Sequence, residues 1–151
     1  MDLGAESGRV MAGHFDGRKI ALEQFRRFPN GPVNLGGTLR WNLVSLWTEI
    51  QNGLREAASK LNGSAVSVGV DTWGVDFVLM NQHDELLGQP WNYRDKRTDG
   101  MLQKAFSRVP RAEIFAETGL QFMQLNSLYQ LLAMCDRDPD LVAQAKRFLM
   151  V

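Results

Sequence analysis

Cysteine and histidine are scarce in this chain, and their scarcity excludes several classes of protein. Cys135 is the only cysteine, so an internal disulfide is impossible and a reducing, cytoplasmic setting is expected. With only two histidines beside it, a closed zinc site is not expected. The first residues have no basic segment followed by an apolar one, and therefore do not predict a signal peptide. No apolar run approaches the roughly 18 residues that a membrane span needs.

An excess of charge of either sign is also missing. Seventeen lysines and arginines balance seventeen aspartates and glutamates, which gives a formal net charge of zero. A non-specific nucleic-acid binder needs a basic surface, and a polybasic membrane anchor needs clustered cations. We therefore expect neither nucleic acid nor membrane as a partner. The apolar share of 44% is typical of a folded domain.

The first third of the chain predicts strands. Residues 9–15 and 19–28 read as a β-hairpin around the turn dipeptide Asp16-Gly17, and residues 2–4 read as the end of an earlier strand. Residues 29–38 are rich in proline, glycine and asparagine and predict a loop.

The middle of the chain predicts a helix and then buried strands. Apolar residues at three- and four-residue steps indicate an amphipathic helix over 43–61, which Asn62-Gly63 would end. The valine-rich run 65–70 suggests a buried parallel strand, and residues 75–80 and 86–91 suggest two further strands.

The last third predicts helices. One begins at Asn126 or Ser127 and another at Pro139, and residues 147–151 read as a final strand. Cys135 has apolar neighbours on the first of these helices and is expected to be a small core residue. Strands interspersed with helices favour a mixed α/β sheet.

The first candidate site is residues 2–9, DLGAESGR. Two glycines flank a tight turn between two strands, where backbone N–H groups can surround an anion. Asp2 could hold a magnesium ion through water, and Arg9 could meet phosphate oxygens. The alternative is an ordinary glycine-rich hairpin turn. The order of strand, turn and strand excludes a P-loop or a dinucleotide site.

Two further segments carry polar clusters. In Asp71-Thr72-Trp73-Gly74-Val75-Asp76, an acid follows a predicted buried strand, where open α/β sheets bind ligands, and the indole offers a face for a sugar ring. In Tyr93-Arg94-Asp95-Lys96-Arg97-Thr98, two arginines and an aspartate could face hydroxyls or phosphate. The alternatives are a turn with a packing tryptophan and a solvated charged loop.

Together these segments resemble the FGGY family of carbohydrate kinases. Residues 2–9 are similar to that family's first phosphate-binding turn, while DTWGVDFVLM at 71–80, YRDKRT at 93–98 and TGLQFMQLNSLYQL at 118–131 resemble its rhamnulokinase branch. The wider family often has a lysine and then a tryptophan in the last segment, where Gln130 and Ala133 stand here.

The resemblance implies a ribonuclease-H-like α/β fold of the actin, hexokinase and Hsp70 type, with a mixed sheet and flanking helices. It implies ATP-dependent phosphorylation of L-rhamnulose at O1, with Mg²⁺ as cofactor and ATP as co-substrate. A related L-fuculose or other ketose kinase stays open as an alternative, as does a non-catalytic nucleotide-binding protein of the actin or Hsp70 type. The oligomeric state is not predicted.

The resemblance also assigns residues to roles. Those that would border the ATP phosphates are Ala5, Glu6, Ser7, Gly8 and Arg9. Asp2 would hold Mg²⁺ through water. Gly74 would contact the sugar through its backbone, and the other expected substrate-binding residues are Asp71, Trp73 and Arg94.

The chain departs from the family in extent. The family's catalytic aspartate lies in a His-Asp-Thr-like segment, which these 151 residues do not contain. The adenosine pocket comes from a second domain. The resemblance therefore implies that residues 1–151 are a partial N-terminal kinase domain, without the rest of that domain or the C-terminal domain, and without catalytic activity alone.

Overall fold

The computed structural model describes all 151 residues, which form two compact units. Unit 1 comprises residues 1–32 and 42–73, and unit 2 comprises residues 33–41 and 74–151. Each unit has buried hydrophobic clusters of its own. None of the helices is long and apolar enough to span a membrane.

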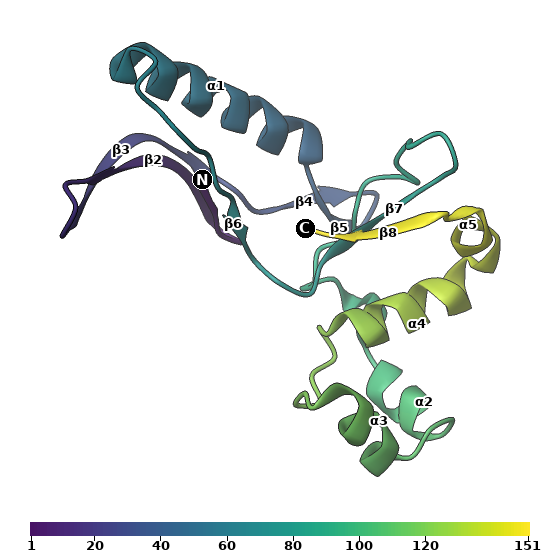
Figure 1. Ribbon diagram of the computed structural model, residues 1–151. Coiled ribbons are helices and arrows are strands. Elements are labelled where there is room, and N and C mark those ends of the chain that lie inside the picture. The colour runs from purple at the N-terminus through teal and green to yellow at the C-terminus, as the bar shows by residue number, and fades with distance from the viewer. The chain divides into compact units, whose positions relative to one another are not determined.

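Unit 1 is a four-stranded sheet with a helix on one face. The strands follow the order β3-β2-β1-β6, with the bounds Asp2–Leu3 (β1), Ser7–Phe15 (β2), Ile20–Pro29 (β3) and Asp71–Thr72 (β6). β1 is antiparallel to β2 and parallel to β6. This confirms the predicted mixed sheet, and the long β2–β3 ribbon in Figure 1 is the predicted hairpin.

Helix α1 spans Leu43–Leu61, as the sequence predicts. The Asn42 side chain accepts a hydrogen bond from the Ser45 amide at 3.0 Å at its start, and Asn62 ends it in the left-handed conformation. The helix packs on the sheet through a core of Leu3, Phe28, Leu46 and Ile50. Trp47, which the periodicity places on the same apolar face, is instead 60% exposed.

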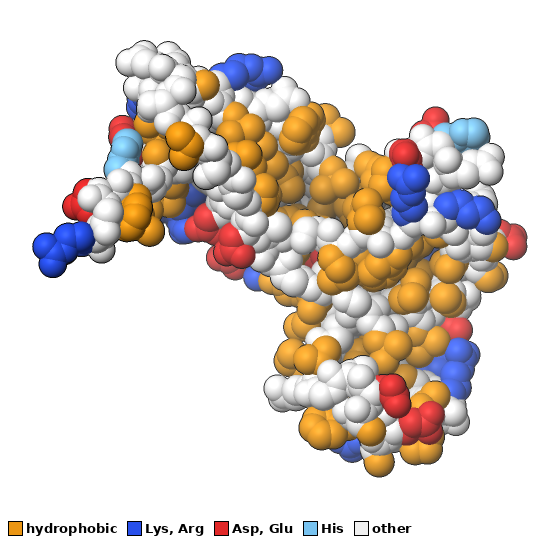
Figure 2. Space-filling view, viewed as in Figure 1, with side chains coloured by type: hydrophobic (Ala, Val, Ile, Leu, Met, Phe, Trp, Pro, Cys, Tyr) orange, Lys and Arg blue, Asp and Glu red, His pale blue; other side chains and the backbone are white.

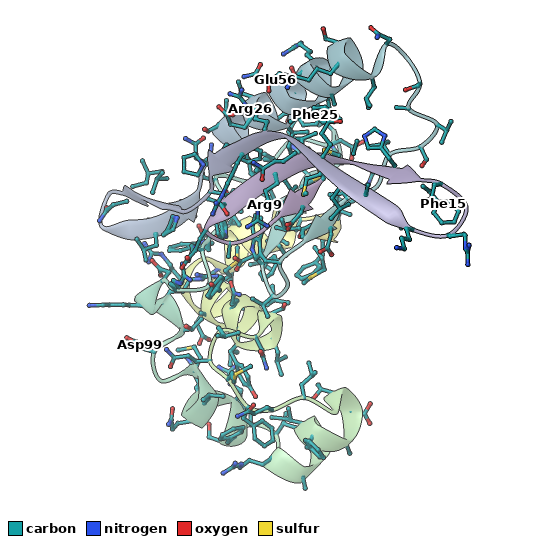
Figure 3. The ribbon with its side chains drawn as sticks, turned by 90° about the vertical axis from the view of Figure 1, so that its left-hand side faces the viewer. Arg9, Phe15, Phe25, Arg26, Glu56 and Asp99 are labelled. Carbon is teal, nitrogen blue, oxygen red and sulfur yellow. The ribbon has the colours of Figure 1, made fainter.

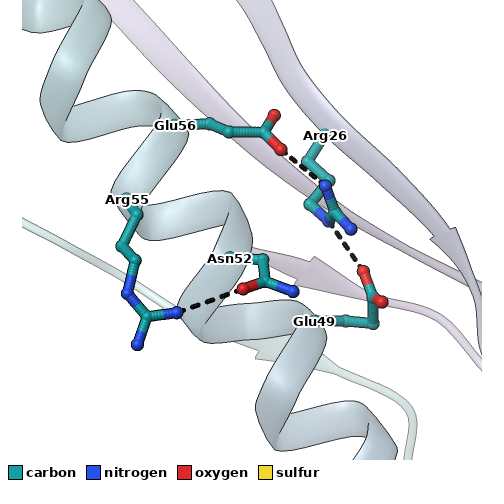
Figure 4. Close-up of polar contacts among 5 residues, drawn as sticks. All are labelled: Arg26, Glu49, Asn52, Arg55 and Glu56. Carbon is teal, nitrogen blue, oxygen red and sulfur yellow. Dashed lines mark hydrogen bonds and ion pairs between the residues drawn. The ribbon is translucent and has the colours of Figure 1, made fainter.

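An ion-pair cluster also ties α1 to β3 (Figures 3 and 4). The Arg26 guanidinium donates to Glu49 at 2.7 Å and to Glu56 at 2.5 Å. Glu49 and Glu56 are two helical turns apart and face the same strand. Their hydrogen bonds, with that to Glu49 the stronger, raise the pKa of Arg26.

Unit 2 places two small sheets beside a set of helices. Its elements are β4 (Pro32–Leu35), β5 (Thr38–Trp41), β7 (Phe77–Met80), β8 (Arg147–Met150), the 3-10 helix Lys96–Thr98, α2 (Met101–Phe106), α3 (Arg111–Thr118), α4 (Ser127–Arg137) and α5 (Pro139–Gln144). Helix α4 lies between the β7–β8 pair and helices α2 and α3 (Figure 1). It therefore has a buried side toward each of them.

Three predicted elements are wrong. Residues 29–38 are not only loop, because β4 and β5 form a hairpin around Gly36 and Gly37, which both have positive φ, as a two-residue turn requires. Residues 65–70 are not a buried strand, because β1 offers β6 only two partner residues. Residues 86–91 form no strand, only isolated bridges at Leu86 and Trp91.

Several apolar side chains are exposed, among them valines of the segment that was predicted to be a buried strand. Val66 is 98% exposed and Val68 is 72% exposed, and Figure 2 shows hydrophobic side chains in contact with solvent over both units. Cys135 is exposed as well, which corrects the expectation that it packs in the core. Its helix buries the side that carries Ala133 and Met134.

Candidate active site

The turn between β1 and β2 is closed by its backbone and braced by Asn30. The Gly4 amide donates to the Ser7 carbonyl at 3.1 Å. Asn30, which is buried, donates from its backbone to the Glu6 carbonyl at 3.0 Å and from Nδ2 to the Gly4 carbonyl at 2.7 Å. The only indication of this role in the sequence is a polar residue near the start of the loop predicted at 29–38.

Gly8 follows this turn in β2, and packing explains why a glycine stands there. It is buried and pairs with Leu3 across the two strands. A Cβ at this position would collide with the Phe28 ring. Glycine therefore lets the turn lie against the core of unit 1, whatever ligand the turn binds.

A row of charges crosses three neighbouring strands beside the turn. The register places Arg9 opposite Asp2, and Asp2 beside Asp71. Side chains of paired residues share one face of a sheet, and this face is opposite to the one on which Leu3 meets α1. Arg9, labelled in Figure 3, donates to the Asp2 carboxylate at 2.5 Å, and both side chains are partly exposed.

The segment after β6 passes from unit 1 into unit 2. Asp71 is exposed at the start of β6, and Trp73 packs against the core of unit 1. Gly74 begins the second part of unit 2 and is exposed, with no atom within 4 Å of the place where a Cβ would stand. A ligand could therefore approach the Gly74 backbone.

The two residues after Gly74 are held by side chains. Val75 has a φ of 69°, a left-handed conformation that β-branched residues rarely adopt. Its carbonyl accepts from Ser127 Oγ at 2.8 Å and from Gln130 Nε2 at 3.0 Å. The fully buried Asp76 accepts from Trp41 Nε1 at 2.5 Å and from Gln130 Nε2 at 3.1 Å.

Arg97 extends this network. Its guanidinium donates to Gln130 Oε1 and, at 3.2 Å, to the Asn92 carbonyl. Burial lowers the pKa of Arg97 to about 10, against the opposing effect of the carboxylates of Asp95 and Asp76. Arg97 is one of the two arginines predicted to face hydroxyls or phosphate, and here its guanidinium faces Gln130 and Asn92. No role was predicted for Asp76 or Gln130, for which the available signal was a polar residue inside an apolar strand or helix face.

Arg94, the expected substrate-binding residue of this loop, is exposed. Its guanidinium carbon lies 5.0 Å from the centre of the Tyr93 ring, and its amide donates to Asn92 Oδ1 at 2.9 Å. The backbone of Arg94 is therefore anchored while its side chain remains accessible.

Comparison with known proteins identifies the family. The whole chain, residues 1–151, matches the N-terminal domain of the FGGY family of carbohydrate kinases. The chain belongs to this family. It is 41% identical to the rhamnulokinase of Oceanobacillus iheyensis over 152 residues and 44% identical to that of Mannheimia succiniciproducens over 153 residues. Each match covers 100% of this chain and 32% of the relative, so the chain spans about a third of their length.

Solved structures of sugar kinases share the fold. The gluconate kinase of Lactobacillus acidophilus superposes with a TM-score of 0.83 at 17% identity, covering 99% of this chain and 30% of that one. A xylulose kinase of the same organism gives 0.82 at 17% identity, covering 98% of this chain and 30% of that one. These likenesses confirm the expected actin- and hexokinase-type fold.

Within this FGGY domain the expected site residues fall into two groups. The residues expected at the phosphates, from Ala5 to Arg9, lie together with Asp2 on one turn and its flanking strands in unit 1. The expected sugar-binding residues are divided between the units, with Asp71 and Trp73 in unit 1 and Gly74 and Arg94 in unit 2.

Proposed function

We propose that this chain is part of an ATP-dependent sugar kinase that phosphorylates L-rhamnulose at O1. The observation that carries the proposal is the similarity to rhamnulokinases along the full length of the chain, at 41% and 44% identity for the two named above. Phosphoryl transfer depends mainly on positioning and on stabilising charge. The turn in unit 1 and the exposed Gly74 backbone suit these two tasks.

The turn between β1 and β2 is the proposed phosphate site. Backbone N–H groups of Ala5, Glu6, Ser7 and Gly8 would border the phosphates, and Arg9 would pair with a phosphate oxygen. Arg9 is held beside the turn by Asp2 and is partly exposed, so its guanidinium can reach a ligand.

The residues beside this turn fit a magnesium ion. Mg²⁺ prefers hard oxygen ligands, keeps several waters and is usually held by one or two carboxylates. Asp2 and Asp71 supply two carboxylates from paired positions on neighbouring strands. Asp2 would hold the ion through water. Bound there, the ion would neutralise charge on the ATP phosphates.

Gly74 is the proposed centre of sugar binding. Its open, exposed backbone would contact the sugar directly. Asp71 and Arg94 are exposed and would offer an acceptor and donors to sugar hydroxyls. Trp73 packs in the core of unit 1, so any contact it makes would use the part of the indole that remains exposed.

We further propose that residues 1–151 are a partial N-terminal domain. No catalytic residue is assigned to this chain, and the catalytic base and adenosine pocket would come from the rest of the protein. The isolated chain is then inactive. The single cysteine supports a cytoplasmic setting for the complete protein.

ADP release from the complete product of the reading frame tests the function. It would be measured with MgATP and, in turn, L-rhamnulose, L-fuculose, D-xylulose and glycerol, with the 151-residue chain as a parallel sample. A strong preference for L-rhamnulose supports the proposal. Preference for another sugar would support a sugar kinase but contradict L-rhamnulose as its substrate. No turnover with any sugar favours a non-catalytic nucleotide-binding protein, and turnover by the 151-residue chain contradicts the proposed extent of the domain.

A further inference from the structure

Gln130 is a buried polar side chain with an unusually complete set of partners. It is 1% exposed on helix α4, beside the core residue Tyr129. The two N–H groups of its Nε2 are shared among three acceptors: the carbonyls of Val75 at 3.0 Å and Leu125 at 2.7 Å, and Asp76 Oδ1 at 3.1 Å. Its Oε1 accepts from Arg97. Because burying an unpaired amide is costly, this side chain is constrained to one position.

One of the residues that Gln130 holds, Val75, has a strained backbone. A β-branched residue at a φ of 69° persists only where its surroundings impose that conformation. Two donors from α4, Ser127 Oγ and Gln130 Nε2, hold the Val75 carbonyl, and Asp76 is fixed by Trp41. The chain is thus anchored on the C-terminal side of the Val75 Cα.

This anchoring decides the orientation of the preceding peptide. The φ of Val75 is the rotation about its N–Cα bond, and the peptide between Gly74 and Val75 is a rigid plane. With the Val75 carbonyl fixed, φ and ψ of Val75 together therefore determine where the Gly74 carbonyl points, and the left-handed conformation sets one direction for it.

We propose that Gln130 is a positioning residue for the sugar site, which holds Val75 in the left-handed conformation and so orients the Gly74 backbone toward the substrate. This inference rests on the proposed function, because it takes the Gly74 backbone as the sugar contact. The amide of glutamine is required at this position because it both donates to Val75 and accepts from Arg97. A lysine could only donate, and a glutamate could only accept.

Kinetics of the complete protein test the proposal. We expect Gln130→Met, which removes the hydrogen bonds at similar volume, to lower kcat/KM for the sugar by roughly 10- to 100-fold through a higher sugar KM. The KM for ATP stays unchanged. Gln130→Glu gives the same pattern, because it retains the acceptor for Arg97 and loses the donor to Val75. Gln144→Met is the matched control, since Gln144 is an exposed glutamine of α5 that bonds only to the Asp140 carbonyl.

Partial unfolding of the variant would not produce this pattern of KM values. A smaller folded fraction lowers kcat and leaves both KM values as they are. If Gln130→Met does not fold, Ser127→Ala removes only the other donor to the Val75 carbonyl, and a smaller rise in sugar KM is expected from it. A loss confined to kcat, or equal changes in both KM values, overturns the proposal.

A structural readout separates this inference from the proposed function. The crystal structure of Gln130→Met is expected to show Val75 outside the left-handed region, whether or not any sugar is phosphorylated. If the unchanged protein phosphorylates no sugar, the proposed function fails. If Val75 keeps its left-handed φ in the variant, the positioning role fails.

Discussion

The turn at residues 4–6 and the turn at residues 74–76 are both short, polar and glycine-containing, yet they are held by different means. The first lies between two paired strands and is closed by a backbone hydrogen bond from Gly4 to Ser7. The second is held by side chains that come from α4 and from β5, through Gln130, Ser127 and Trp41. The first therefore depends on strand register, and the second on packing of distant segments.

The glycines at the two turns therefore differ in role: one serves the stability of the fold, and the other leaves the backbone accessible. Beside the first turn, Gly8 of β2 is needed because the Phe28 ring leaves no room for a side chain, and Asn30 bonds to the backbone of the turn itself. In the second, Gly74 is exposed and the structure around it constrains its neighbours Val75 and Asp76 instead. Glycines of similar appearance in the sequence thus serve packing in one case and access in the other.

The largest expected effect comes from the buried aspartate of the second turn. Asp76→Ala removes the acceptor of Trp41 Nε1 and a carboxylate that stabilises the charge of Arg97. Leaving a buried donor without its acceptor costs about 1–3 kcal/mol, and Asp76 is the acceptor of two buried donors, Trp41 Nε1 and Gln130 Nε2. We expect this loss in the free energy of unfolding, measured by urea denaturation.

Asp71→Ala is the matched control, because Asp71 is an exposed aspartate five residues earlier in the same segment. Its effect on stability should stay within about 0.5 kcal/mol. Equal losses for the two variants would show that the second turn does not depend on its buried network.

Alanine at the two glycines gives the next largest difference. Gly8→Ala forces a Cβ against the Phe28 ring, and such overpacking costs about 1–3 kcal/mol. Gly74→Ala meets no atom within 4 Å and should change stability by less than about 0.5 kcal/mol. In the complete protein, Gly74→Ala should raise the sugar KM, because the new methyl group occupies the proposed approach to the backbone.

If Gly74→Ala destabilised the protein more than Gly8→Ala, the proposed difference between the two turns would be wrong. A Gly74→Ala protein with unchanged stability and an unchanged sugar KM would remove Gly74 from the sugar site.

The same contrast explains which parts of the fold could be predicted from the sequence, because only local signals can be read there. The β2–β3 hairpin and helix α1 were predicted because their signals, the Asp16-Gly17 turn and the period of the apolar residues, are local. The β1–β2 turn was found for the same reason. Residues 65–70 were predicted wrongly because a strand needs a partner that local pattern does not reveal.

The network of unit 2 was missed because its members are isolated in the sequence. Gln130 and Asp76 are 54 residues apart, and each stands alone in an apolar stretch. Each lies in a segment that resembles rhamnulokinases, but that resemblance does not pair the two residues. Only the fold shows that the amide of one meets the carboxylate of the other, and that both constrain the backbone next to Gly74.

A smaller effect is expected from the brace of the first turn. Asn30→Ala removes the hydrogen bond from Nδ2 to the Gly4 carbonyl but keeps the backbone bond to Glu6. A net loss of about 1 kcal/mol is expected, since one hydrogen bond is lost at a buried position. In the complete protein the KM for ATP should rise while the sugar KM does not. A rise in the sugar KM alone would contradict the assignment of ATP to the first turn and of the sugar to the second.

A net effect on stability smaller than that of Asn30→Ala is expected from Val75→Gly. Glycine adopts left-handed backbone freely, so the substitution relieves about 1–2 kcal/mol of strain. Glycine also has more backbone freedom in the unfolded state, which destabilises the fold by about 0.5–1 kcal/mol. In addition, it lacks the partly buried side chain of valine. These effects nearly cancel, so the free energy of unfolding should change by less than about 1 kcal/mol. Val78→Gly, at a partly buried valine of strand β7, has no strain to relieve and should cost clearly more. Equal costs in a urea titration would mean that Val75 stores no strain, and the second turn would then be held no more tightly than the first.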